Sequence, residues 1–240
     1  MIEQISEMSE LTEFKQTDIF SVRVFSLANA YGFKYPFVSF YRQLDDDGNV
    51  TAIMSSLDKV ITLAVKSKAD YDELTDFLSF VGYSSLFCAD EFVLDKSYSY
   101  GEIMKSSKKI ELPCDYRVID EYPHLYDLFN FIDYPDVDFE SWYVDISHRI
   151  RHGASKAYTV NIDDEIVSSA IFSSIYNDDA VLSAVQTKPE YRGRGYASSL
   201  VSAMCCDVKG TVYLMREEGR NEHFYKALGF ENCGKWRMYK

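Results

Sequence analysis

The sequence has no long uninterrupted run of apolar residues. None approaches the roughly 18 residues that a membrane-spanning helix needs. The start, 1–7, is acidic and has neither the basic nor the apolar region of a signal peptide. Hydrophobic residues still make up 47% of the 240 positions, which is enough for a packed core. We therefore expect a cytoplasmic protein without a membrane partner, built as one large or two small domains.

Basic charge is also in short supply. Lys and Arg number 25 against 38 Asp and Glu, which leaves a formal net charge of −13. A protein that binds nucleic acid needs positive surface to neutralise phosphates, so this balance argues against nucleic acid as a partner. The acidity is explained by ordinary solubility. Attraction of a cationic, amine-bearing substrate is the alternative explanation.

Neither a disulfide framework nor a metal site is indicated. The cysteines number five, an odd count, and Cys205 and Cys206 are adjacent. No Cys/His spacing is typical of zinc, so we expect reduced thiols and no metal. His148 and His152 are four residues apart and could form a metal pair. With arginines at 149 and 151, they are better interpreted as a basic helix end that complements the helix dipole.

The periodicity of apolar residues predicts a series of strands and helices. Helices are expected at 13–31, 71–81, 123–131, 141–150 and 221–229, and strands at 37–44, 50–57, 60–65, 84–88, 156–162, 166–176, 180–187 and 211–215. The acidic stretch 45–49 is typical of a hairpin turn. Residues 92–116 show no clear period. The pattern predicts an α/β fold with a mixed, mostly antiparallel sheet flanked by helices.

Two stretches of the chain resemble one another. Residues 60–71 align with 180–191 without a gap, at an offset of 120 (180 − 60). Each stretch follows an acidic hairpin turn and precedes an amphipathic helix and a short strand. We interpret this as two copies of one α/β unit, residues 1–115 and 116–240. Chance similarity between two strand–helix units is the alternative.

The stretch 180–204 carries the strongest signal for a ligand. An apolar strand ends before Pro189, which cannot donate a ladder hydrogen bond. A turn rich in Gly and Arg, 192–195, follows, and then a helix with one apolar face. Glycines allow close approach of backbone N–H groups, a helix N-terminus carries about half a positive charge, and the arginines add full charges. This combination predicts a site for a phosphate or pyrophosphate.

The turn is neither a Rossmann fingerprint nor a Walker A loop, because it has neither G-x-G-x-x-G nor Gly-Lys-Ser/Thr. It resembles R/Q-x-x-G-x-G/A, motif A of the GNAT superfamily of N-acetyltransferases, preceded as in that family by V-x-T-x-P-x-Y. The stretch 221–230, NEHFYKALGF, is similar to the family's N-x-x-F-Y-x-x-x-G-F signature. The resemblance covers roughly residues 158–240.

The resemblance implies two tandem GNAT-like units, with acetyl-CoA as co-substrate of the second. The pyrophosphate would be held by Arg192, Gly193, Arg194, Gly195, Tyr196 and Ala197, and the pantetheine arm would pair with the backbone of Val185, Gln186 and Thr187. Asn221 matches a position that contacts the pantetheine arm or the substrate. Its alternative role is to cap a helix.

The resemblance also implies catalytic roles. Tyr225 matches a Tyr that protonates the leaving thiolate, and a packed aromatic beside Phe224 and Phe230 is the alternative. Glu217 and Glu218 are the nearest candidates for the base that takes the amine proton. Solvated surface acids are the alternative for both.

The expected function is an acetyl-CoA-dependent N-acetyltransferase that acts on a primary amine of a small molecule or peptide, by direct attack in a ternary complex. A catalytically silent acyl-CoA sensor or scaffold is the rival from another class. Transfer of an aminoacyl group from tRNA is disfavoured by the acidic charge.

The first copy differs where the chemistry would be. After Tyr71 come Asp72, Glu73 and Asp76, where the second copy has its Gly-rich turn. Carboxylates repel a pyrophosphate, and Cβ atoms hinder close approach of the backbone. We therefore expect residues 1–115 to lack a coenzyme A site.

Overall fold

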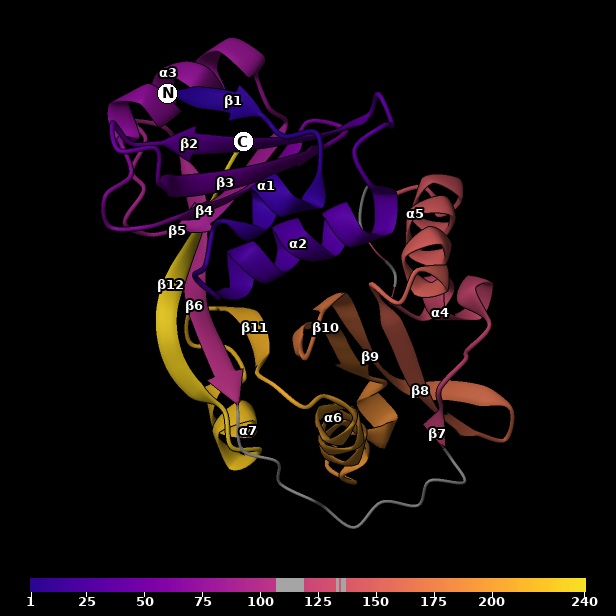
Figure 1. The fold of residues 1–240 in the computed structure, drawn as a ribbon. Coiled ribbons are helices and arrows are strands. Elements are labelled where there is room, and N and C mark those ends of the chain that lie inside the picture. The colour runs from indigo at the N-terminus through magenta and orange to yellow at the C-terminus, as the bar shows by residue number, and fades with distance from the viewer. Residues whose placement is uncertain (107–118, 133, 135–136) are drawn as a thin grey trace. The chain divides into compact units, whose positions relative to one another are not determined.

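The computed structural model describes residues 1–106, 119–132, 134 and 137–240. They form two compact units (Figure 1). Unit 1 comprises Met1–Ile103, Met215–Glu218 and Cys233–Lys240, and unit 2 comprises Met104–Leu214 and Gly219–Asn232. The predicted boundary between residues 115 and 116 lies outside the described residues, so that division stays a prediction.

Unit 1 holds the first set of strands and helices. They are β1 (Ile2–Gln4), α1 (Met8–Thr12), α2 (Ile19–Tyr31), β2 (Val38–Leu44), β3 (Val50–Leu57), β4 (Val60–Val65), α3 (Tyr71–Val81) and β5 (Ser85–Ala89), with the beginning of β6 (Tyr98–Ser106) and most of β12 (Glu231–Tyr239). The strands pair in the order β1-β2-β3-β4-β5-β12. All of these pairs are antiparallel except β4 with β5.

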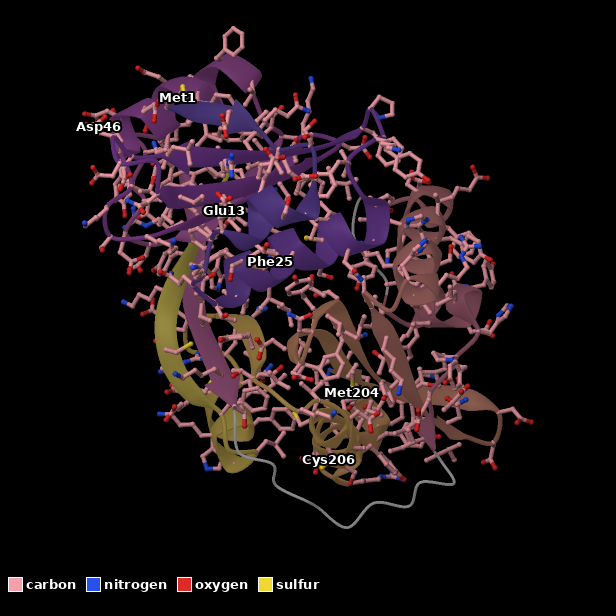
Figure 2. All side chains as sticks on the ribbon, in the orientation of Figure 1. Met1, Glu13, Phe25, Asp46, Met204 and Cys206 are labelled. Carbon is pink, nitrogen blue, oxygen red and sulfur yellow. The ribbon has the colours of Figure 1, made fainter. Side chains whose placement is uncertain are left out.

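Helices cover both faces of the unit 1 sheet. α3 buries Leu74 and Leu78 against Met54 and Leu63, while α2 contacts β3 and β4. Phe25, labelled in Figure 2, belongs to α2 and is buried. Successive residues of a strand point to opposite faces of the sheet. Since helices cover both faces, both alternating sets of side chains are apolar.

The helix predicted at 13–31 begins later than its periodicity indicates. α2 starts at Ile19 rather than at residue 13. The carboxylate of Asp18 accepts hydrogen bonds from the N–H groups of Phe20 and Ser21, which fixes the helix start there. Phe14 is buried outside the helix, so its apolar character reflects tertiary packing rather than helical periodicity.

Unit 2 holds the second set. Its elements are β7 (Ile119–Asp120), α4 (Leu125–Ile132), α5 (Phe139–Arg151), β8 (Lys156–Ile162), β9 (Glu165–Tyr176), β10 (Asp179–Thr187), a 3₁₀ turn at Pro189–Tyr191, α6 (Tyr196–Asp207), the first half of β11 (Val212–Glu217) and α7 (Glu222–Ala227). The strand order is β11-β10-β9-β8-β7. β10 and β11 are parallel, and the other pairs are antiparallel.

The unit 2 sheet is also covered on both faces. α6 packs Leu200 and Met204 onto a core that contains Tyr158 and Phe172. Met204 is fully buried and is labelled in Figure 2. α4 and α5 cover the opposite face. In the described part of the chain, no helix combines the length and the apolar composition needed to span a bilayer.

The predicted repeat is visible in the order of elements. In each unit an antiparallel pair, β3–β4 or β9–β10, leads into a helix and then into a parallel strand. The parallel ladder runs from Val60↔Ser85 to Thr62↔Phe87 in unit 1 and from Ala180↔Val212 to Leu182↔Leu214 in unit 2. The β3–β4 ladder is regular, whereas the β9–β10 ladder shifts register twice.

Four strands and one helix were not predicted: β1, β6, β7, β12 and α1. β6 lies in the stretch without a clear period, and Gly101 interrupts its pattern. A Cβ atom at residue 101 would stand 2.1 Å from the carbonyl oxygen of Arg216 and 2.8 Å from Nε1 of Trp236. The glycine is therefore a close-packing requirement inside a strand, not a strand end.

Candidate active site

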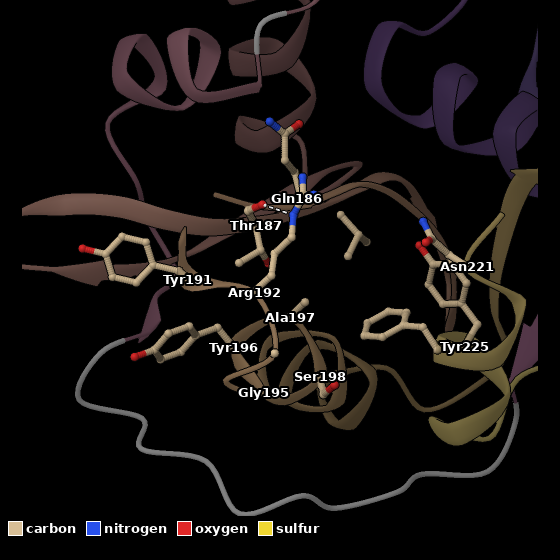
Figure 3. A pocket seen from close by; sticks show the side chains of 13 residues that line it. Gln186, Thr187, Tyr191, Arg192, Gly195, Tyr196, Ala197, Ser198, Asn221 and Tyr225 are labelled. Carbon is tan, nitrogen blue, oxygen red and sulfur yellow. Dashed lines mark hydrogen bonds between the residues drawn. The ribbon is translucent and has the colours of Figure 1, made fainter. Parts of the chain in front are cut away.

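A pocket of about 720 Å³ lies within unit 2 (Figure 3). Its lining consists of Val185, Gln186, Thr187, Tyr191, Arg192, Gly193, Gly195, Tyr196, Ala197, Ser198, Asn221, Phe224 and Tyr225. The end of β10, the turn into α6, and the beginning of α7 contribute these residues. Of the residues predicted to hold the cofactor, only Arg194 is outside this lining.

The turn before α6 has the backbone that glycine allows. Gly193 has φ +74° and Gly195 has φ +84°, and Gly195 stands at the N-cap of α6. No atom lies within 4 Å of a Cβ built at either position. The glycines are therefore needed for the positive φ angles of the turn, and the space above the turn is open. The first N–H groups of a helix have no hydrogen-bond partner within the helix. In α6 these N–H groups lie at this turn.

The two arginines of the turn behave differently. The Nε–H of Arg192 donates to the carbonyl oxygen of Thr187 at 3.1 Å, which holds its guanidinium at the end of β10 (Figure 3). Arg194 donates from Nη2 to the carbonyl oxygen of Glu190 at 3.0 Å and lies over the ring of Tyr191. Both side chains are exposed, so each remains accessible to an anion.

β10 carries a bulge where it meets the pocket. Its ladder with β9 passes from Ser183↔Ile171 directly to Gln186↔Ser169, which leaves Ala184 and Val185 in the bulge. Ala184 has φ +50°, a left-handed conformation that is uncommon for alanine. The ladder between β10 and β11 ends at Leu182, before this point. No sequence signal marked Ala184, because alanine does not favour such a conformation.

Tyr225 is at once a packed aromatic and a lining residue. It is 8% exposed, and its ring lies 4.9 Å from that of Phe224 and 5.7 Å from that of Phe230. Burial raises the pKa of the Tyr225 hydroxyl to about 12. The hydroxyl therefore stays protonated at neutral pH and acts as a donor.

Asn221 occupies the N-cap position of α7, but its side chain makes no capping hydrogen bond. Its backbone is left-handed, with φ +55° and ψ +15°, which asparagine tolerates better than most residues. The side chain lines the pocket together with Tyr225 (Figure 3).

The predicted bases are not among the residues that line this pocket. Glu217 and Glu218 are exposed and belong to the Met215–Glu218 segment of unit 1. Among the described lining residues there is no acid. The role of the two glutamates stays a prediction. In the described ranges, no group of three or more His, Cys, Asp or Glu side chains could hold a metal ion.

The corresponding helix start in unit 1 is filled by its own side chains. Asp70 accepts from the N–H of Glu73, as an N-cap. The carboxylate of Glu73 accepts from Nε2 of Gln43 at 2.7 Å and pairs with the amino group of Met1 at 2.9 Å. In the alignment of the two copies, the carboxylate of Glu73 thus takes the position of Gly193, and Thr75 takes that of Gly195.

The family model of the GNAT acetyltransferases matches residues 119–230, which include the whole pocket lining. This segment is a GNAT acetyltransferase domain. The family implies acetyl-CoA as the co-substrate of this GNAT domain. No curated protein sequence matches the chain significantly.

Several solved structures, GNAT proteins among them, share the fold of this chain. A tandem GNAT protein from the clavulanic acid biosynthesis pathway is 10% identical, with a TM-score of 0.57 over 100% of this chain and 97% of that one. A Drosophila protein is 14% identical, with a TM-score of 0.67 over 100% and 98%. A GCN5-related N-acetyltransferase from Kribbella flavida is 13% identical, with a TM-score of 0.55 over 78% and 85%. The chain thus has a tandem GNAT fold.

Proposed function

We propose that the chain transfers the acetyl group of acetyl-CoA to the nitrogen of a primary amine, within the unit 2 pocket. The observation that carries the proposal is that one pocket joins three features: a bulged strand end, a glycine turn at a helix N-terminus, and a buried tyrosine hydroxyl. Each feature matches one chemical part of acetyl-CoA.

The glycine turn suits the pyrophosphate. Open space above Gly193 and Gly195 lets backbone N–H groups approach the phosphate oxygens, and the dipole of α6 adds to the attraction. Arg192 contributes a full positive charge at the end of β10. The backbone of Val185, Gln186 and Thr187 then pairs with the amide groups of the pantetheine arm, as an added strand would.

The chain's residues act on the bond that breaks. The nitrogen of the neutral amine forms a bond to the acetyl carbon, and the carbon–sulfur bond breaks. The Val185 N–H, in the bulge, donates to the carbonyl oxygen as negative charge develops there. The Tyr225 hydroxyl donates its proton to the departing sulfur, and the proton that the nitrogen loses leaves to a carboxylate or through water. The products are an N-acetylated amine and coenzyme A.

The acceptor is a small-molecule or peptide amine. The net charge of −13 supports a cationic acceptor, because an acidic protein attracts positive solutes over long range. A cytoplasmic location belongs to the same proposal, since acetyl-CoA and reduced thiols are both available there.

A silent acyl-CoA sensor is the second candidate, and one observation favours it. The described lining of the pocket contains no acid to take the amine proton. A sensor would bind acetyl-CoA in the same pocket and turn over no amine.

Calorimetry with acetyl-CoA tests the binding half of the proposal. We expect one site per chain in the wild type and none in Gly195→Glu, because the added carboxylate crowds and repels the pyrophosphate. Gly153→Glu is the matched control, since Gly153 also has positive φ (+67°) and open space but does not line the pocket. It should bind normally. A second site in the wild type would overturn the silent role of residues 1–115.

Release of free thiol from acetyl-CoA with a panel of primary amines tests the catalytic half. Amine-dependent release supports the transferase. Normal binding with no release for any amine class supports the sensor, and absence of binding contradicts both.

A further inference from the structure

Two serines of β9 hold the bulge of β10 through their hydroxyls. The Oγ–H of Ser169 donates to the carbonyl oxygen of Ala184 at 3.0 Å, and that of Ser168 donates to the carbonyl oxygen of Gln186 at 2.9 Å. Both serine side chains are fully buried. At the bulge, where the register of the β9–β10 ladder shifts, the two serine hydroxyls therefore donate hydrogen bonds to carbonyl oxygens of β10.

The bond from Ser169 fixes the direction of a peptide unit. No peptide bond in the described residues is cis, so the Ala184–Val185 unit is trans and planar. In such a unit the C=O and the N–H point in opposite directions. Because the Ala184 carbonyl points to Ser169 on β9, the Val185 N–H points away from β9. Val185 is also one of the residues that line the pocket.

We propose that Ser169 is a positioning residue that aims the Val185 N–H at the carbonyl oxygen of the acyl group. This inference rests on the proposed function, in which the Val185 N–H polarises the thioester carbonyl. It explains what holds that N–H in place. Ser169 touches neither substrate nor reacting atoms and acts through the Ala184–Val185 peptide unit.

The left-handed conformation of Ala184 makes this support necessary. An alanine at φ +50° is less stable than in the β region, so the peptide unit tends to rotate when nothing holds it. A backbone donor stabilises a developing oxyanion only when it is already aimed at it, and a small rotation removes that alignment. The buried hydroxyl of Ser169 supplies the opposing restraint.

Ser169→Ala removes the hydroxyl with little change in volume. We expect kcat to fall about tenfold, which is part of the loss seen when an oxyanion donor is removed altogether. The affinity for acetyl-CoA should stay within about twofold of wild type, because the turn and α6 are untouched. Ser173→Ala is the matched control: its Oγ–H donates to the Val181 carbonyl oxygen across the same strand pair, at the other register shift. Its kcat should match wild type.

Infrared difference spectroscopy gives a readout that mere destabilisation does not move. With acetyl-CoA labelled at its carbonyl carbon, the carbonyl stretch of the bound thioester should lie at lower wavenumber than in solution for wild type and Ser173→Ala. For Ser169→Ala it should return toward the solution value. The melting temperature of each variant shows whether it is folded.

The outcomes separate this inference from the proposed function. If wild type shows no amine-dependent turnover, the proposed transferase activity fails. If wild type turns over and Ser169→Ala has an unchanged kcat and carbonyl stretch, Ser169 has no positioning role while the transferase stands. An equal loss in Ser169→Ala and Ser173→Ala would also overturn the inference, because it would show a general effect of β9.

Discussion

The side-chain amide of Gln186 donates a hydrogen bond of 3.1 Å from Nε2 to the carbonyl oxygen of Phe131, one residue before the end of α4. Gln186 also lines the pocket, so this bond connects the pocket wall to a helix on the other face of the unit 2 sheet. A carbonyl near a helix C-terminus lacks an intrahelical partner, and Gln186 provides one.

Gln186→Glu should loosen the end of α4. A carboxylate cannot donate, so it would face the Phe131 carbonyl oxygen and repel it. Loss of a half-buried bond with an unsatisfied partner costs about 1–3 kcal/mol. Hydrogen exchange should show reduced protection in α4 and unchanged protection in α6. Gln16→Glu is the control, because exposed Gln16 also donates to a main-chain carbonyl, that of Val65. It should leave α4 unchanged.

Gly195→Ala separates backbone strain from ligand contact. A Cβ at residue 195 meets no protein atom within 4 Å, but φ +84° is unfavourable for alanine by about 1–2 kcal/mol. Gly153→Ala, at φ +67° and with equal space, should cost a similar amount in a chemical-denaturation experiment. The affinity for acetyl-CoA should fall only in Gly195→Ala. Equal affinities in the two variants would argue against the turn as the pyrophosphate site.

Tyr225→Phe should lower kcat about a hundredfold, the lower range for general acid catalysis by a positioned group. Tyr213→Phe is the control, since Tyr213 is equally buried, at 8% exposure, but does not line the pocket. Its kcat should remain close to wild type.

The pH dependence follows from the sign of the Tyr225 shift. Burial raises its pKa from 10.0 to about 12, so the donating, protonated form persists as the pH rises through 10 and is lost only near 12. The wild-type kcat should therefore show no decline from this group between about pH 8 and pH 10.5. An alkaline limb near pH 10 that disappears in Tyr225→Phe would contradict this assignment.

Gly101→Ala should destabilise unit 1. The new Cβ would lie 2.1 Å from the Arg216 carbonyl oxygen, which is backbone and cannot turn aside. Overpacking of this kind typically costs about 1–3 kcal/mol, and more where backbone must move. Gly234→Ala, whose Cβ would make an ordinary contact of 3.7 Å with Ile103, should be close to neutral. Thermal unfolding of the two variants provides the comparison, and equal melting temperatures would contradict the close-packing role of Gly101.

The fold was predictable wherever one apolar pattern decided the structure. The bounds of β3, β4, α3 and β8 agree with the periodicity, because each has side chains buried by its own unit. β12 escaped prediction because its first five residues are exposed and their pattern carries no apolar face. β6 was not predicted because its glycine, Gly101, is required by close packing against Arg216 and Trp236, which are distant in the sequence.

The site divides in the same way. Gly193 and Gly195 could be found because only glycine favours positive φ and leaves space for an anion. The Ala184 bulge and its Ser169 partner could not, because the bond between them depends on the pairing of β9 with β10. A serine in a strand has no pattern that distinguishes this role.

The pairing of β12 with β5 has a consequence during synthesis. Trp236, Arg237, Met238 and Tyr239 are the partners of β5 in unit 1, and the ribosome makes them after it has made β7 to β11. Until then β5 presents an open edge, which is a template for pairing with another chain. The unit made first is therefore the one finished last, and a nascent chain stalled before residue 233 is the species most exposed to aggregation.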